Sequence, residues 1–227
     1  MNNTAPPADS FTLLREKGPF QLFRNTDTMA QSPTPQDLKL VCSISGSGII
    51  ARDVAGSWTM GNPTLKNRDI FQVRGHSQTE VSGLSSTQYS QRGSLSLLLT
   101  QPHILLLDTR EWGNGIELDA RRFLACSGNL SADTGILPDS GTNGSPDAVI
   151  LSLAGAGVVC LLSDWPVHEL SYETFSGSTL TVYDSAPLAW SRELRVSAGK
   201  EQNRSVRTYT AKGHMTRKVL LHPSTLQ

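Results

Sequence analysis

The stretch Leu38-Lys39-Leu40-Val41-Cys42-Ser43-Ile44 decides the fold class. Apolar residues recur at every second position from Leu38 to Ile44, and successive side chains of a β-strand point to opposite faces of a sheet. The stretch therefore predicts a strand with one apolar face. A glycine-rich turn at 46–48 ends it, and a second apolar run follows at 49–54.

Further short apolar runs follow along the chain, and each predicts a strand. The further predicted strands lie around Trp58 and at 69–73, 95–99, 103–108, 122–126, 148–153, 158–163, 167–172, 180–184 and 188–191. The runs at 95–99 and 103–108 are nearly all apolar and are separated by Gln101-Pro102, which favours strands buried on both faces over a helix. Many short strands with turn signals between them predict an all-β fold, a sandwich or barrel with few or no helices.

Residues 1–36 are expected to form a flexible N-terminal arm, because prolines punctuate a mainly polar stretch. Within it, the pattern at 11–17 suggests one short helical turn. The apolar residues that would anchor this arm to the body of the protein are Phe20, Leu22 and Phe23.

The β domain is expected to span residues 37–195, with a basic C-terminal tail at 196–227. The apolar run at 219–221 suggests that the tail ends as an added strand. No linker divides the central region into two domains.

The overall composition is that of an ordinary globular protein, with 37% hydrophobic and 18% charged residues and no net charge. The charge is unevenly distributed, however. Residues 108–184 hold eleven acidic residues against three arginines, and residues 185–227 hold eight Lys and Arg residues against Glu193 and Glu201. Such a tail can dock on the acidic segment of another copy, bind nucleic acid or lipid headgroups, or simply be solvated.

The three cysteines, Cys42, Cys126 and Cys160, each lie in an apolar run and form no C-x-x-C pair. This pattern predicts reduced, buried thiols and an intracellular protein. The first residues lack the apolar region of a secretory signal, and Asp9 and Glu16 interrupt what would be a mitochondrial presequence. No apolar stretch reaches the roughly 18 residues that span a bilayer.

Signatures of catalysis are missing from the sequence. His168-Glu169 is followed by Leu170, Ser171 and Tyr172, so the zinc-hydrolase pattern H-E-x-x-H does not occur. The histidines are scattered, and no G-x-S-x-G nucleophile elbow is present. We therefore expect no enzyme activity, no catalytic residues, no metal site and no cofactor.

The basic tail contains the candidate binding residues. The cations that alternate there with Tyr209 and His214 are Arg204, Arg207, Lys212, Arg217 and Lys218. Cations that neutralise phosphates, together with a ring for base stacking, are the minimum equipment for binding RNA or another anion.

Three stretches carry a resemblance to a known family. They are Arg122-Phe123-Leu124-Ala125-Cys126-Ser127 after the run at 103–108, then 153–161 continuing to 167–170, and 180–190. In this order and spacing they resemble the altered-inheritance-of-mitochondria family, also called the mitochondrial biogenesis family. Trp165-Pro166 stands where the family usually has Gly, and the last 30 residues do not follow the family ending.

The resemblance implies a fold like that of the trp RNA-binding attenuation protein (TRAP-like), a β-sandwich or double-stranded β-helix that is often trimeric in bacterial relatives. It also implies a mitochondrial location with a link to inner-membrane organisation, although a cytoplasmic location remains the alternative. No enzyme activity or cofactor is implied.

Three functional hypotheses follow. The first is a non-enzymatic scaffold or assembly factor that acts through protein contacts or self-association, with peripheral association to the inner membrane. The second is RNA binding through the tail, for instance as a ribosome-associated factor. The third is a β-barrel that binds a small molecule.

Overall fold

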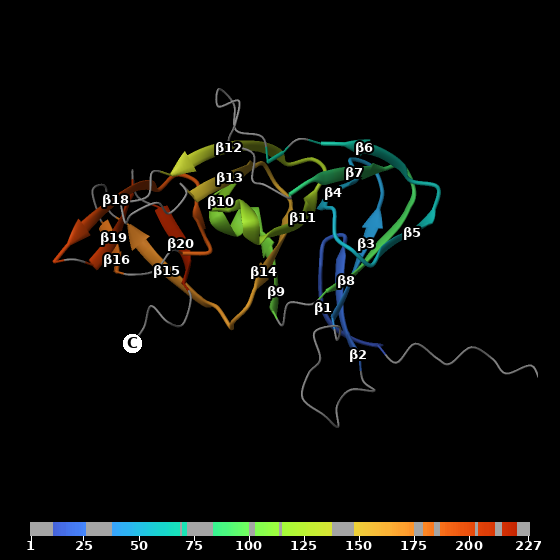
Figure 1. Ribbon diagram of the computed structural model, residues 1–227, viewed down its shortest axis with the longest axis horizontal. Coiled ribbons are helices and arrows are strands. Elements are labelled where there is room, and N and C mark those ends of the chain that lie inside the picture. The colour runs from blue at the N-terminus through green and yellow to red at the C-terminus, as the bar shows by residue number, and fades with distance from the viewer. Residues whose placement is uncertain are drawn as a thin grey trace, which may run out of the picture.

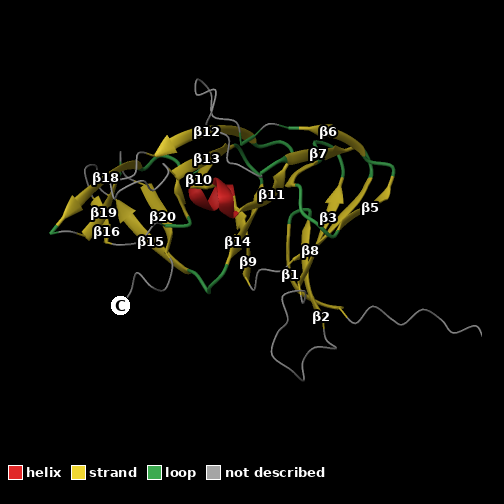
Figure 2. Ribbon diagram, in the orientation of Figure 1, coloured by secondary structure: helices red, strands yellow, loops and turns green. Residues whose placement is uncertain are grey.

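The computed structural model describes residues 11–25, 38–68, 70–71, 84–99, 103–113, 115–137, 148–174, 179–183, 187–202, 204–211 and 215–221. These residues form strands β1 to β20 and two short 3-10 helices, η1 (Thr109–Trp112) and η2 (Ala120–Arg122). All strand pairs are antiparallel, and Figure 2 shows the two helices as the red segment among yellow strands. The predicted all-β fold class is confirmed.

The strands form four sheets, named here I to IV. Sheet I has the order β1 (Phe11–Lys17), β2 (Phe20–Asn25), β3 (Leu38–Ile44), β8 (Gly93–Leu99), β5 (Ser57–Gly61). Sheet II has the order β6 (Thr64–Asn67), β7 (Ser86–Ser90), β4 (Ile49–Arg52), β11 (Phe123–Ser127), β14 (Val158–Ser163), β9 (His103–Asp108).

The C-terminal half supplies the other two sheets. Sheet III has the order β12 (Ser131–Leu137), β13 (Ala148–Ala154), β10 (Gly115–Asp119), β17 (Ala189–Ser191), β20 (Met215–Leu221), β15 (His168–Thr174). Sheet IV has the order β16 (Thr179–Tyr183), β19 (Arg204–Thr210), β18 (Arg195–Glu201). In Figure 1 the blue and cyan strands of sheet I lie at one end of the molecule and the orange and red strands of sheet IV at the other.

Three apolar clusters hold successive sheets together. The first joins sheets I and II, the second joins sheets II and III, and the third joins sheets III and IV. Sheet II is therefore covered on both faces. In β14, Val158 and Cys160 face the first cluster whereas Val159 and Leu161 face the second, which explains why its apolar run is continuous.

The prediction of strands buried on both faces is confirmed for 103–108 and wrong for 95–99. In β9, Leu106 packs in the first cluster and Leu107 in the second. In β8 the first cluster takes Leu97, but Leu98 lies on the outer face of sheet I and is half-buried. The predicted strand at 69–73 is also wrong in its described part, where Ile70 and Phe71 form a turn.

The N-terminal arm is corrected by the structure. Residues 11–17 form strand β1 and not a helical turn, and β2 follows at 20–25. Phe20 and Leu22 alternate into the first cluster, which fixes β2 beside β3 and gives β1 a partner to pair with. The predicted anchor is thus confirmed for these two residues, and the rest of the predicted arm lies outside the described residues.

The tail at 196–227 is not an appendage. Its predicted boundary falls inside β18, and β20 lies between β17 and β15 in the interior of sheet III. The suggested strand at 219–221 is the end of β20, where Val219 is fully buried in the third cluster. The tail therefore completes two sheets, since β18 and β19 supply most of sheet IV.

Candidate protein-docking face

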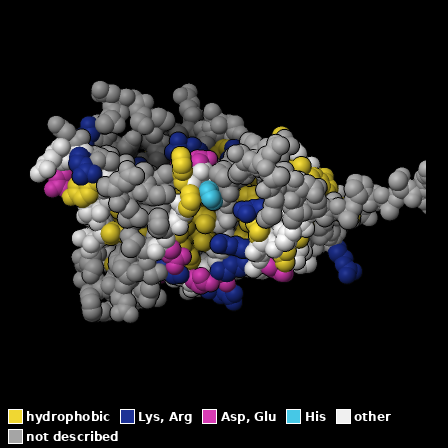
Figure 3. Space-filling model, turned by 90° about the horizontal axis from the view of Figure 1, so that it is seen from below, with side chains coloured by type: hydrophobic (Ala, Val, Ile, Leu, Met, Phe, Trp, Pro, Cys, Tyr) yellow, Lys and Arg dark blue, Asp and Glu magenta, His cyan; other side chains and the backbone are white. Residues whose placement is uncertain are grey.

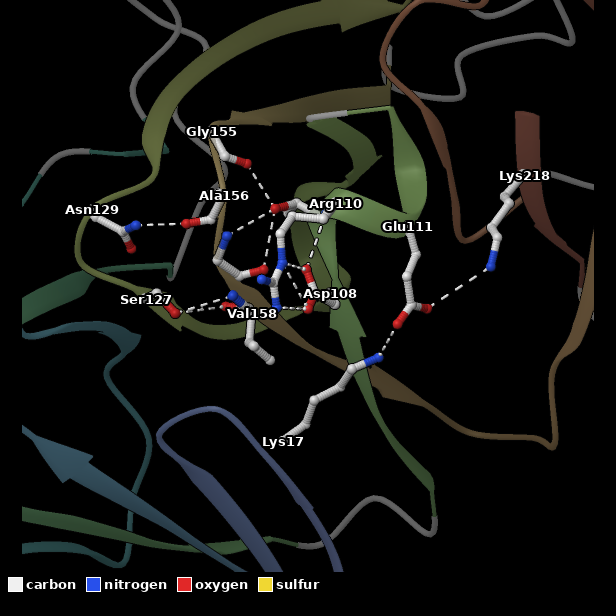
Figure 4. Close-up of polar contacts among 12 residues, drawn as sticks. Lys17, Asp108, Arg110, Glu111, Ser127, Asn129, Gly155, Ala156, Val158 and Lys218 are labelled. Atoms are coloured by element: carbon white, nitrogen blue, oxygen red, sulfur yellow. Dashed lines mark hydrogen bonds and ion pairs between the residues drawn. The ribbon is translucent and has the colours of Figure 1, made fainter. Parts of the chain in front are cut away.

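The centre of the molecule carries a polar junction around η1 (Figure 4). The Asp108 carboxylate caps η1 by accepting from the Arg110 backbone N–H at 3.0 Å, and it also accepts from the Arg110 guanidinium, Nη2 to Oδ2 being 2.6 Å. The Arg110 side-chain hydrogen bonds lower the pKa of Asp108 to about 2. Next to it, the Thr109 hydroxyl donates to the Gly155 carbonyl at 2.7 Å and accepts from Gly157 N–H at 2.9 Å. The Thr109 hydroxyl therefore fastens the 155–157 turn to η1, and the Asp108 carboxylate caps η1.

Part of the basic segment forms ion pairs with acidic side chains of the same chain. Lys218, from the basic segment, lies 2.7 Å from Glu169 and 3.9 Å from Glu111, both from the acidic segment. Arg217 forms an ion pair with Glu193. On the face shown in Figure 3, basic side chains lie next to acidic ones. Lys218 of the tail therefore pairs with the acidic segment of the same chain, whereas the Arg217 pair lies within the basic segment.

The five candidate cations do not share one surface. Arg217 is 1% exposed. Lys218 is half-buried among its acidic partners, and Arg207 is half-buried on the strand face that carries Tyr209. Arg204 is exposed on sheet IV, and Lys212 lies outside the described residues.

Arg204 has its own small cluster on sheet IV. Its guanidinium carbon lies 4.9 Å from the ring centroid of Tyr183, which is 37% exposed. The Tyr183 hydroxyl donates to Glu201 at 2.9 Å, and this bond raises the pKa of Tyr183. The cation and the ring are thus held together beside a carboxylate.

No three His, Cys, Asp or Glu side chains in the described ranges gather as ligands for a metal ion. No helix in this part of the chain is long and apolar enough to cross a membrane.

The face of sheet I opposite the first cluster carries apolar side chains that belong to none of the three clusters. The strand register places Leu13, Phe23, Lys39 and Leu98 side by side across β1, β2, β3 and β8. All four lie on the face opposite the first cluster, because the intervening residues of these strands point inward. Three apolar side chains and one cation thus form a continuous row.

Large apolar side chains protrude at both margins of this face. Leu13 on β1 is 46% exposed, and on β5 Trp58 is 39% and Met60 65% exposed. The alternation of β5 puts Trp58 and Met60 on the same face. We name the surface formed by Leu13, Phe23, Lys39, Trp58 and Met60 the outer face of sheet I.

A lysine connects the two margins of the outer face. Lys39 Nζ lies 5.2 Å from the ring centroid of Phe11 on one edge strand and 5.4 Å from that of Trp58 on the other. A cation at this distance from an aromatic ring is attracted by about 0.5–1 kcal/mol at an exposed site. These contacts favour the arrangement in which the Lys39 side chain lies between the two rings.

The edges of sheet I are less suitable for pairing than its face. In β1 the register shifts between Leu13 and Arg15, and a bulge of this kind disrupts the pairing of an added strand. Arg15, Glu16 and Lys17 follow, and charged residues on an edge strand also oppose strand addition. At the other edge, β5 ends at Gly61 and Pro63 comes soon after.

The sequence pattern does not predict most of this face. It assigns Phe11 to a flexible arm and Trp58 only to a short segment. The signal for Lys39 was present in the alternation, which puts it opposite Leu38 and Leu40. What the alternation cannot tell is whether another layer covers that opposite face.

Comparisons with known proteins inform the fold. A scan against models of protein families and a search of curated proteins find no match to this chain. The crystal structure of a Streptococcus pyogenes protein, determined by a structural genomics consortium, is similar with a TM-score of 0.58 at 17% sequence identity. The match covers 93% of this chain and 92% of that one. At this identity the likeness shows the fold alone.

Proposed function

We propose that this chain is a non-enzymatic scaffold or assembly protein that binds a protein partner through the outer face of sheet I. The observation that carries the proposal is the exposure of Leu13, Trp58 and Met60 around Lys39, on the face of sheet I opposite the first cluster. Clustered exposed apolar side chains mark interaction sites, and tryptophan is enriched among the residues that dominate binding energy.

The apolar side chains of the outer face indicate the kind of partner. Leu13, Trp58 and Met60 are exposed on it, and an apolar surface of another protein would bury them on binding. We take the partner to be a different protein, and self-association through the same face is the alternative.

The family resemblance adds a cellular setting to the proposal. The motifs at 122–127, 153–170 and 180–190 support membership of the mitochondrial biogenesis family. With that membership, the partner would be a mitochondrial protein, at or near the inner membrane. The alternative is a cytoplasmic scaffold with the same docking face.

The test is affinity purification from intact cells, with bound protein and bound RNA both identified. We expect the wild-type chain to recover a protein partner and the Trp58→Ser, Met60→Ser double variant to lose it. Leu65→Ser and Trp165→Ser are matched controls, because each removes a side chain that is 57% exposed and lies outside the outer face of sheet I. Retention of the partner by the double variant would refute the proposal.

RNA binding is the second candidate, favoured by the stacked pair of Arg204 and Tyr183 on sheet IV. The variant that tests RNA binding is Arg204→Gln with Arg207→Gln. Arg217 and Lys218 are left unchanged because they form ion pairs within the folded chain. Recovery of RNA that disappears in this variant, and that weakens steeply with salt, would support the RNA function. If the double variant recovers as much RNA as the wild type, the RNA-binding hypothesis is wrong.

A further inference from the structure

A second surface, far along the chain from the outer face of sheet I, has the features of a ligand site. A groove of about 310 Å³ lies on sheet III beside the third apolar cluster. Glu117, Ser152, Trp190 and Arg192 line it. This volume is at the lower end of the range of roughly 300–1,000 Å³ for small-molecule sites, so it suits a small ligand.

The register of sheet III builds the groove from four neighbouring strands. Asp133, Ser152, Glu117 and Trp190 stand in one row across β12, β13, β10 and β17. Residues paired in this way share one face of a sheet. Glu117 therefore lies next to Trp190, and Ser152 and Asp133 continue the row on the same face. Trp190 is 1% exposed and forms part of the third cluster.

Glu117 is the most constrained polar group of the groove. Its Oε2 accepts a hydrogen bond from Trp190 Nε1 at 2.8 Å, and within the described residues no group donates to Oε1. Burial raises the pKa of Glu117, although the Trp190 bond and the charge of Arg192 oppose this effect. A half-buried carboxylate oxygen of this kind is stabilised by any further donor that enters the groove.

Arg192 supplies a positive charge on the same side of the sheet. Its stem packs over Gly115, where an added Cβ would lie 3.0 Å from Cδ of Arg192. Gly115 and Glu117 are two residues apart on β10 and so face the same way. In the described part of the chain, no carboxylate lies within ion-pair distance of the Arg192 guanidinium, and its side chain is exposed.

From this arrangement we propose that the groove binds a small zwitterion of the amino-carboxylate class. The ammonium group donates to Oε1 of Glu117, and the carboxylate binds the guanidinium of Arg192. The carbon stem of the ligand lies against Ile150 and Trp190. A carboxylate and a guanidinium that are close but unpaired with each other match the two charged ends of such a molecule.

The experiment follows the indole N–H resonance of Trp190 by heteronuclear NMR, identified with Trp190→Phe. The probes are glycine, β-alanine, γ-aminobutyrate and ε-aminocaproate, each compared with the alkylamine and the alkanoate of the same length. We expect a saturable shift with at least one amino carboxylate and a response weaker by about tenfold when either charge is missing, because charge-assisted hydrogen bonds contribute about 1.5–3 kcal/mol. No saturable shift with any of the four, or an equal response to the amine alone, would overturn the proposal.

Variants locate the response in the groove. Glu117→Gln and Arg192→Gln should each weaken binding by about tenfold or more. Gly135→Trp should abolish it, because a side chain at Gly135 meets no atom within 4 Å and so projects into open space by β12 without strain. Gly199→Trp is the matched control, since Gly199 is also a strand residue with nothing within 4 Å. Undiminished binding by Gly135→Trp would place the ligand elsewhere and overturn the assignment.

The groove and the outer face of sheet I belong to different sheets, so their tests are independent. Loss of the protein partner in the Trp58 and Met60 variant leaves the Trp190 response unchanged. Failure of the zwitterion to bind likewise says nothing against the docking face.

Discussion

Nζ of Lys17 on β1 lies 2.8 Å from Oε1 of Glu111 in η1, which ties the edge strand of sheet I to the turn between sheets II and III. The two residues are 94 positions apart in the sequence. Their side chains are 31% and 51% exposed, so water screens the pair.

This exposure predicts a small energetic contribution from the pair. A double-mutant cycle with Lys17→Met and Glu111→Gln should give a coupling free energy below about 1 kcal/mol in urea unfolding. High salt should reduce it further. A coupling of several kcal/mol would contradict the screened geometry and imply a drier junction.

Asp108 should make stability depend on pH in the acidic range. Its folded-state pKa of about 2 is below the ordinary value of 3.8, so its contribution is fully present above about pH 4 and is lost as the pH falls toward 2. Asp108→Asn should lower the free energy of unfolding at neutral pH by about 1 kcal/mol, since asparagine can keep the helix cap but loses the charge-assisted hydrogen bonds to the Arg110 guanidinium. The same variant should flatten the acid limb of stability against pH, as followed by circular dichroism. An unchanged acid limb would exclude Asp108 as its source.

Gly48 should tolerate no side chain. Its φ is +79°, and an added Cβ would lie 2.1 Å from the Tyr89 carbonyl oxygen. Gly46 has a φ of +54° with nothing within 4 Å of an added Cβ, so it isolates the cost of the left-handed backbone. We expect Gly46→Ala to destabilise by about 1 kcal/mol and Gly48→Ala by clearly more, measured by urea unfolding. Equal effects would mean that the close backbone approach at Gly48 relaxes freely.

Arg217 and Arg204 should contribute very differently to the free energy of unfolding, although both come from the basic tail. Arg217 is 1% exposed and pairs with Glu193, so Arg217→Ala removes buried contacts and should cost about 3 kcal/mol. Arg204 is exposed, and Arg204→Ala should cost less than about 1 kcal/mol. Thermal unfolding of the two variants tests this contrast. Equal stability would mean that the tail is not an integral part of sheets III and IV.

The three thiols should be inert in the folded protein. Cys42, Cys126 and Cys160 are fully buried, and burial raises the pKa of each, that of Cys126 to about 12. Because the thiolate is the reacting form, a disulfide reagent at neutral pH should modify none of them until denaturant is added. Rapid reaction in native buffer would show that the first two clusters open readily.

Particular strands show which parts of the fold the sequence predicts. The alternation from Leu38 to Ile44 predicted β3 with its inward and outward faces. A strand that packs on the core with one face needs an apolar residue at every second position, and this local pattern is visible in the sequence. The same reasoning failed for β1, whose exposed residues carry no apolar alternation. That strand exists because β2 is anchored beside it.

The candidate binding residues were predicted from the sequence even less well than the strands. The basic run at 204–218 suggested one binding surface, yet the fold sends Arg217 inward and leaves Arg204 outward. Nothing in the local pattern marked Glu117 and Trp190 as partners, because they are 73 residues apart and meet only through strand pairing.

The sequence by itself determined that this protein is built of β-sheets, because side chains with a two-residue apolar period can be buried together only on the face of a sheet. The tertiary structure alone decided which faces stay open. Among the described residues, apolar clusters cover both sides of sheet II but only the inner side of sheet I, and strand pairing across long sequence separations places Lys39 between two rings. Such juxtapositions depend on non-local contacts, which a local pattern of residues does not encode.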